Sequence, residues 1–380
     1  MRRLLVVNML YTFIVACLAV MVPLYLIEQN VDITSIGLIL AIGPISFLVI
    51  RVLFATIADE IGTKTIAFIY SISNLAAIAL YAMVVSPLGF AAANLAEGVR
   101  ASGFWAITRT EVLQRNGDGD AGRILAHFSN MRQLADGAGR LFIGFMLAWL
   151  AFQGSFILFF ILSAALFLLV MSVERGKVKN PQIGASNIQR IFKRRPKTFW
   201  EATILQMLAW LPYNMLLGFL IPLYLVAGLG MGYAETGLLL ALLSLAIGAS
   251  AILSMRWQLH KHALLALAMV AVPALILLPL SGQFVILPIL AASIGLGASS
   301  IMAEYILVDQ VCRSKDVSTD IGVLYGPLKL AEFTFLSLGG LVIMQFGYAP
   351  LFFICALCMA LFVLLSMRLI SPGRWTRISL

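Results

Sequence analysis

Long apolar runs recur along the whole chain and are separated by short polar stretches. Each run has about 20 residues, enough to cross the hydrocarbon core of a bilayer as an α-helix. The runs are much longer than the alternating strands of a membrane β-barrel. They predict twelve transmembrane helices, at residues 4–27, 33–56, 64–84, 88–110, 123–150, 154–173, 200–227, 233–255, 262–280, 284–311, 320–345 and 349–370.

The two halves of the chain repeat a pattern. Residues 22–26 read Val-Pro-Leu-Tyr-Leu and residues 221–225 read Ile-Pro-Leu-Tyr-Leu, and a Gly-Leu pair follows at a similar offset in both. A polar stretch with eight basic residues and one acid, 174–198, separates the halves. We therefore predict an all-α membrane protein of two pseudo-symmetric six-helix bundles. The bundles are residues 1–173 and 200–380, joined by a basic cytoplasmic linker at 174–199, and the second ends in a short cytoplasmic tail.

The charges of the predicted loops indicate their sides of the membrane. With the N-terminus in the cytoplasm, every Lys and Arg of the loops falls on the cytoplasmic side, including the linker. The opposite loops, which hold neither residue, are 28–32, 85–87, 152–154, 228–232, 281–282 and 346–348. Basic residues collect on the cytoplasmic side of membrane proteins, so the pattern predicts that both termini are cytoplasmic.

Composition supports a membrane protein and excludes a soluble one. Hydrophobic residues make up 62% of the 380 residues, charged residues 11%, and the mean hydropathy is +1.00. Soluble domains are about a quarter charged. The net charge of +9 follows from the basic cytoplasmic loops, so no nucleic-acid partner is predicted. Cys355 and Cys358 lie in an apolar helix as ordinary buried thiols, and no disulfide framework is readable.

Ionisable residues inside the predicted spans are the first candidates for a functional site, because charge in the membrane needs a partner or a watery cavity. Two interpretations stay open. The residues form pairs that lock the fourth helix to the fifth and the tenth to the eleventh, or they line a cavity, bind substrate and exchange protons. The set is Glu97, Arg100, Arg132, Asp136, Arg140, Glu304, Lys329 and Glu332.

Aromatic and amide groups on the first and seventh predicted helices add further candidates. Gln206, Trp210 and Asn214 are spaced four residues apart and share one helix face, with Tyr213 beside it. In the repeat, Tyr11 is the counterpart of Trp210. Such a stripe either joins helices through hydrogen bonds or lines a central site.

Residues 55–64 read Ala-Thr-Ile-Ala-Asp-Glu-Ile-Gly-Thr-Lys. Twelve spans in two halves, together with this segment between the second and third helices, resemble the major facilitator superfamily. Asp59, Gly62 and Lys64 match the family's motif in this loop, whereas Ala55 and Glu60 replace a glycine and a basic residue. The resemblance implies that Asp59, Gly62 and Lys64 form a conformational gate. It also implies that the first, fourth, seventh and tenth helices line a central cavity.

These observations predict a secondary active transporter in the inner cell membrane that moves a small solute by alternating access. Proton coupling and export of an amphiphilic compound are favoured, so the predicted protein is an antiporter that acts in efflux. Proton-linked uptake of a small metabolite by symport is the alternative, and a non-transporting sensor or scaffold on the same fold is another. The expected partners are the solute, H⁺ and lipid, with the chain a monomer. No cofactor, metal or enzymatic activity is predicted, because nucleophile, phosphate-loop and zinc motifs are absent from the sequence.

Overall fold

The computed structural model describes the backbone of residues 2–173, 195–257, 259–311 and 317–369. Most of the predicted linker and the C-terminal tail lie outside these ranges. So do the side chains of Asp59 and Gly62, two of the three predicted gate residues, whereas Lys64 is described and exposed. Within the ranges, the side chains not described are those of residues 2, 52, 55–63, 108–127, 129–130, 283, 308–309, 311, 317–318 and 369.

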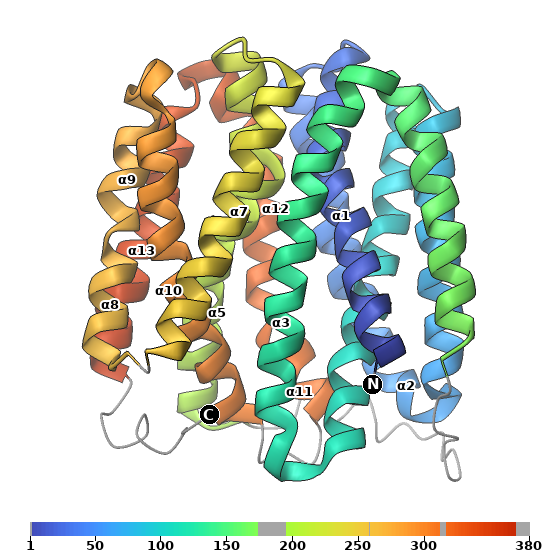
Figure 1. Ribbon diagram of the computed structural model, residues 1–380, viewed down its shortest axis with the longest axis vertical. Coiled ribbons are helices and arrows are strands. Elements are labelled where there is room, and N and C mark those ends of the chain that lie inside the picture. Colours follow the sequence, from blue (N-terminus) through green and yellow to red (C-terminus); the bar gives the residue numbers. More distant parts are fainter. Residues whose placement is uncertain (1, 174–194, 258, 312–316, 370–380) are drawn as a thin grey trace.

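The described chain is built of helices, and no β-strand occurs in it, which confirms the predicted all-α class (Figure 1). The first half holds α1 (Arg2–Glu28), α2 (Ile33–Met83) and α3 (Pro87–Met171). The helices of the second half are α5 (Lys197–Met215), α6 (Ile221–Leu223), α7 (Tyr233–Arg256), α8 (Lys261–Met269), α9 (Ala271–Leu277), α10 (Ile286–Val311), α11 (Val317–Leu324), α12 (Gly326–Phe346) and α13 (Ala349–Leu369). Two π-helical segments, η1 (Leu216–Leu220) and η2 (Tyr224–Gly228), flank α6, and two 3₁₀ turns, η3 (Leu278–Leu280) and η4 (Gly282–Phe284), follow α9.

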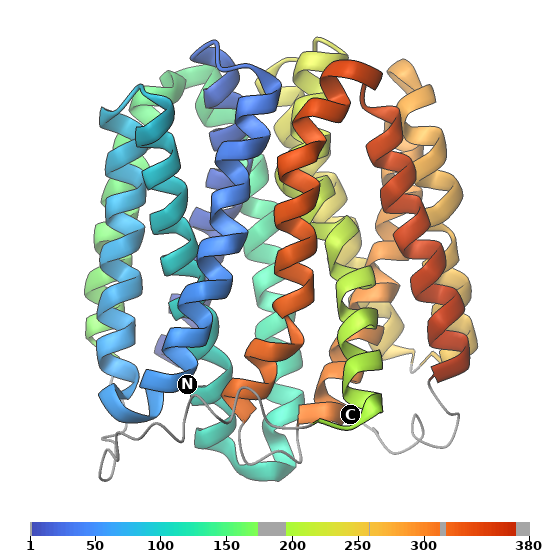
Figure 2. The same ribbon diagram turned by 180° about the vertical axis from the view of Figure 1, so that it is seen from behind.

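Ten stretches of the described helices are long and apolar enough to span a bilayer. Two of them, Ile33–Arg51 and Lys64–Met83, belong to α2, which turns back on itself at the lower edge of Figure 2. Helical turns continue through 57–63, where the sequence predicted a loop. Another stretch, Met131–Met171, has 41 residues and would be about 62 Å long if straight, about twice the hydrocarbon core.

That stretch turns back at Ala151, whose φ of 50° no continuous right-handed helix contains. The reversal follows directly after the helix end that the sequence predicted at residue 150. The count of twelve helices and the cytoplasmic placement of both termini stay predictions.

Large apolar side chains cover the outside of the helices. Leu88 is 85% exposed, Trp149 81% and Phe284 75%. Apolar patches of this extent are rare on soluble monomers, whereas lipid tails solvate them favourably. The exterior therefore agrees with the helices in identifying a multi-pass membrane protein.

Asp32 caps the start of α2. Its Oδ1 accepts a hydrogen bond from the backbone N–H of Ser35 at 2.9 Å. Hydrogen bonds from the side chain and then the backbone of Ser35 lower the pKa of the Asp32 carboxyl below its usual value. The carboxylate therefore stabilises the folded state above its unfolded pKa, and this contribution is lost as the pH falls through the folded pKa.

We expect Asp32→Ala to destabilise the protein by about 1 kcal/mol at neutral pH, because it removes the cap. The deficit shrinks in acid, where the wild-type carboxyl is protonated as well. Thermal unfolding in detergent at neutral and at acidic pH measures both effects. Asp32→Asn, which keeps a capping oxygen without a titratable group, is the control. An Asp32→Ala variant as stable as the wild type at neutral pH would show that the cap contributes nothing.

Two pairs of glycines bring the two halves of the chain into backbone contact. Gly37 of α2 faces Gly340 of α12, where a Cβ added to Gly340 would lie 2.7 Å from Thr34 Cα. Gly144 of α3 faces Gly237 of α7, where a Cβ added to Gly237 would lie 2.5 Å from Gly144 Cα. Only glycine permits such an approach, so these contacts depend on all four residues.

The glycine pairs also relate α3 to α12. Gly37 and Gly237 are the repeat glycines of the sequence, and each packs against the partner glycine and the carbonyl four residues before it. Gly144 and Gly340 are therefore equivalent positions in the two halves. Eight residues before each lies a carboxylate, Asp136 in α3 and Glu332 in α12.

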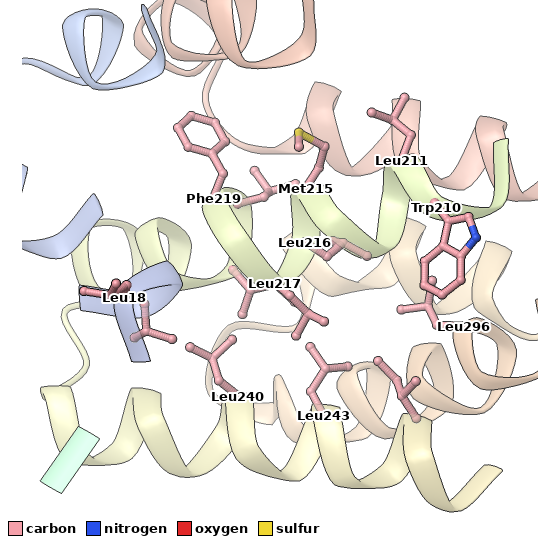
Figure 3. Packing of buried hydrophobic residues seen from close by; sticks show 14 of the residues in the cluster. Leu18, Trp210, Leu211, Met215, Leu216, Leu217, Phe219, Leu240, Leu243 and Leu296 are labelled. Atoms are coloured by element: carbon pink, nitrogen blue, oxygen red, sulfur yellow. The ribbon is translucent and has the colours of Figure 1, made fainter. Parts of the chain in front are cut away.

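One apolar core runs through both halves. Figure 3 shows Leu216 and Leu217, in the π-helical segment after α5, facing Leu240 and Leu243 of α7. All four side chains are at most 2% exposed. The core therefore fixes the helical segment Lys197–Gly228, which carries several candidate site residues, against α7.

Candidate functional site

A cavity of about 410 Å³ lies between the two halves of the chain. It is lined by α1, α2 and α3 from the first half and by the segment Lys197–Gly228, α10, α11 and α12 from the second. Arg140 is not in the lining and lies behind Asp136. The sequence candidates that line the cavity are Tyr11, Glu97, Arg100, Asp136, Trp210, Tyr213, Asn214, Glu304, Lys329 and Glu332.

Glu97 and Arg100 form an ion pair within α3. Arg100 Nη2 lies 3.4 Å from Glu97 Oε2, and Arg100 Nη1 donates to Asn74 Oδ1 at 3.1 Å. The guanidinium also lies 5.8 Å from the ring centre of Tyr11, which stacks on Phe104. Arg100 is thus held from three directions and is 3% exposed.

Glu97 is held less firmly than Arg100. Its side chain is 22% exposed. Its second carboxylate oxygen, Oε1, is buried and has no hydrogen-bond partner among the described residues. An unpartnered buried anionic oxygen is unfavourable.

Arg140 joins the two halves through a backbone carbonyl. Its Nε and Nη2 donate to the two carboxylate oxygens of Asp136 at 2.8 and 3.2 Å. Its Nη1 donates to Leu217 O, in the second half, at 2.9 Å. The ion pair joins residues of one helical turn. Arg140 therefore does not pair with a described residue of the fourth predicted span, 88–110, as the interpretation of locked helices required.

The sequence explains why Leu217 O is available. In the π-helical segment the N–H of Ile221 donates to Leu216 O, five residues back. The next residue, Pro222, has no N–H to donate. The carbonyl of Leu217 is therefore left without its helical donor, and Arg140 supplies one.

Lys329 and Glu332 form the corresponding pair in α12. Lys329 Nζ lies 2.6 Å from Glu332 Oε2, and Asn214 Nδ2 donates to Glu332 Oε1 at 2.6 Å. Lys329 Nζ also lies 5.0 Å from the ring centre of Phe47, in the first half of the chain. Lys329 does not pair with a residue of α10, contrary to the expectation of a lock between the tenth and eleventh helices. Asp136 and Glu332, equivalent in the repeat, thus each bind a basic residue of their own helix.

The predicted stripe of the seventh helix divides into two parts. Trp210 Nε1 donates to Gln206 Oε1 at 2.9 Å, and Gln206 in turn donates to Ala303 O of α10. Trp210 and Gln206 thus connect α5 to α10, and Trp210 also lines the cavity. Tyr213 OH donates to Gln133 Oε1, in the first half, at 3.2 Å. Tyr213 and Asn214 thus contact different helices from one side of the cavity.

Several cavity residues were not singled out as site residues from the sequence. Arg51 and Phe47 of α2 and Trp105 of α3 line the cavity, as does Arg132, whose role was left open. Arg51 lies inside the predicted span 33–56, so the rule that selected Glu97 could have found it. Phe47 and Trp105 carry no such signal, because aromatic residues are common in any apolar helix.

A sequence model of the Major Facilitator Superfamily matches residues 4–311. The fold resembles the crystal structure of a D-xylose–proton symporter, with a TM-score of 0.75, 12% identity and 98% of each chain covered. It also resembles a crystal structure of the nucleoside transporter NupG in a mutant form, with a TM-score of 0.68, 13% identity, and 97% of this chain and 99% of that one covered. A search of curated protein sequences gives no match. The family match covers most of the chain and the structural likeness extends over nearly all of it: the chain is a membrane transporter that belongs to the major facilitator superfamily.

Proposed function

We propose that the chain is a proton-coupled secondary transporter of the inner cell membrane that moves a small solute by alternating access. Residues 1–173 and 200–380 are the two moving bundles, residues 174–199 link them, and the monomer is the working unit. Export of an amphiphilic compound is the preferred direction, and proton-linked uptake is the alternative. The apolar lining of the cavity by residues such as Leu18, Leu40 and Phe219 supports an amphiphilic solute.

The observation that carries the proposal is the state of Glu97. Its carboxylate faces the cavity between the bundles, and its Oε1 is buried without a partner. Protonation of Oε1 removes a buried negative charge from the cavity wall and weakens the attraction to Arg100. A carboxylate in this position can take a proton in one state of the cycle and release it in the other.

The contacts between the halves support motion between two states. At the level of the cavity they are side-chain contacts: Arg140 to Leu217 O, Tyr213 to Gln133, and Lys329 over Phe47. Each of these can break and form without unfolding a helix. The glycine pairs, in contrast, close one end by direct backbone contact. This arrangement fits a state in which the solute reaches the cavity from the other end.

We expect Glu97→Gln to lose proton-driven transport and to keep solute exchange. Glutamine fills the same space but carries no proton between the two sides. Exchange in the absence of a gradient needs no net proton movement and survives. Proteoliposomes with an internal pH-sensitive dye, tested against sugars, amino acids, organic anions and cationic dyes, report solute-dependent proton flux, which falls to the level of protein-free vesicles in the variant.

Glu201→Gln is the matched control. Glu201 pairs at 3.7 Å with Lys197, whose side chain is 90% exposed, and such surface pairs contribute little. Solute-dependent proton flux that persists undiminished in Glu97→Gln would refute coupling at this residue. The sign of the flux separates export in exchange for protons from uptake together with them.

A further inference from the structure

Charged side chains of both signs surround the cavity. Among the described residues, four basic and four acidic side chains line it, and Arg140 is bound behind Asp136. Three of the basic residues are held by a carboxylate of their own helix, in the pairs Arg100–Glu97, Arg140–Asp136 and Lys329–Glu332. The basic residues are Arg51, Arg100, Arg132, Arg140 and Lys329, and the acidic ones are Glu97, Asp136, Glu304 and Glu332.

Arg132 differs from the three paired residues. Its guanidinium carbon lies 4.9 Å from the ring centre of Trp105, and it forms no ion pair or hydrogen bond with the part of the chain that the structure describes. Asp136, one helical turn away, has both oxygens bound to Arg140. Arg132 lines the cavity, so its side chain borders the space that a solute would occupy.

The contact with Trp105 restricts the orientation of this guanidinium. An aromatic ring attracts a cation through its face and limits its rotation. The N–H groups at the free edge of the guanidinium form a fork that matches the two oxygens of a carboxylate. The Arg132–Trp105 pair is thus a prearranged receptor for a planar anionic group.

The rest of the cavity accommodates an apolar group. Val15, Leu18 and Val22 of α1, with Leu328 and Leu336 of α12, also line it. The volume of about 410 Å³ lies in the range of sites for small ligands. A solute with one anionic end and an apolar body would satisfy both parts of this surface.

We propose that the cavity binds a small amphiphilic organic acid as its carboxylate, with the carboxylate on Arg132 and the apolar body against the leucine-rich wall. The inference rests on the proposed transport function and names its substrate class. A cation is disfavoured next to Arg132, whose positive charge would repel it.

Thermal stabilisation of the purified full-length protein in detergent tests the proposal. The probes are octanoate, phenylacetate and 1-naphthoate, each compared with its own primary amide, which has the same shape without the charge. We expect at least one acid, and not its amide, to raise the unfolding temperature. In Arg132→Gln the affinity for that acid falls by about tenfold or more, the usual effect of losing a charged hydrogen-bonding partner.

Two further variants keep the test decisive. Arg132→Lys retains the charge but not the fork, and is expected to recover only part of the affinity. Arg256→Gln removes an exposed arginine at the end of α7 and is expected to bind as the wild type does. Unfolding without ligand shows whether each variant is folded.

The proposal is overturned if the amides bind as tightly as the acids, or if folded Arg132→Gln retains wild-type affinity. It is also overturned if no acid stabilises the protein at concentrations up to about 10 mM, beyond the range of weak specific binding. These outcomes are separate from those of the proton-flux assay. Proton-coupled transport of a neutral solute would leave the proposed function intact and refute the organic acid as the substrate. Acid binding without proton flux would support the substrate class and refute the proton coupling.

Discussion

Gly237→Val is expected to stop transport by keeping the two halves from closing at the contact between Gly144 and Gly237. A Cβ at Gly237 would lie 2.5 Å from Gly144 Cα and 3.0 Å from Arg140 O, and both are backbone atoms that no rotamer change can move away. Overpacking of this kind costs about 1–3 kcal/mol. If only the closed state bears the cost, its population relative to the open state falls by about 5- to 150-fold.

Spin labels at Ser86 and Phe284 would measure the opening. Both residues are exposed and lie in different halves of the chain, Ser86 after the span Lys64–Met83 and Phe284 after the span Lys261–Leu280. In a cysteine-free background, the distance between the labels is expected to lengthen in Gly237→Val and in its repeat equivalent, Gly340→Val.

Gly232→Ala is the control for Gly237→Val. It lies five residues earlier on the same end of the molecule, and the nearest atom to its added Cβ is 4.0 Å away. Wild-type transport and an unchanged label distance in Gly237→Val would show that the glycine contact does not have to close.

Glu332→Gln is expected to produce the largest loss of stability among the substitutions in the cavity wall. Glu332 is 3% exposed, and it is the carboxylate partner of Lys329, whose side chain is 19% exposed. Removing one member of a buried ion pair leaves an uncompensated charge, which costs about 3 kcal/mol or more. Chemical unfolding in mixed detergent micelles measures this change in the free energy of unfolding.

A second substitution separates the charge from other effects at this position. In Lys329→Met/Glu332→Gln the unpaired ammonium is gone, so the double variant is expected to regain most of the lost stability. Transport is not expected to return with it. Single and double variants of equal stability would show that the charge of Lys329 is solvated in the cavity and needs no carboxylate.

The spans and the charged residues within them were predictable because both are local properties of the sequence. An apolar run of the right length specifies a membrane helix by itself, and Glu97 or Glu332 stands out inside one without reference to any other residue. The repeat at Pro23 and Pro222 likewise required only a comparison of the two halves. Ala151 was not distinguished as the turning residue, since alanine gives no local signal for a positive φ.

The partners of these charged residues were not predictable, because pairing depends on how helices rotate against one another. The sequence allowed Arg140 to face Glu97 on the neighbouring helix or Asp136 on its own. The structure pairs it with Asp136 and adds Leu217 O. The contact between Arg132 and Trp105 was not predictable either, because it joins two of the predicted spans, 88–110 and 123–150, and neither stretch of sequence indicates it.

The bond between Arg140 and Leu217 O has a consequence for how this chain can vary. The accepting atom belongs to the main chain, so any residue type at position 217 supplies it. Pro222 leaves this atom available, because its ring takes the place of the N–H that would otherwise donate to it. The side chain at position 217 therefore carries no information about the bond, whereas Arg140, the donor, and Pro222, five positions after Leu217, both do.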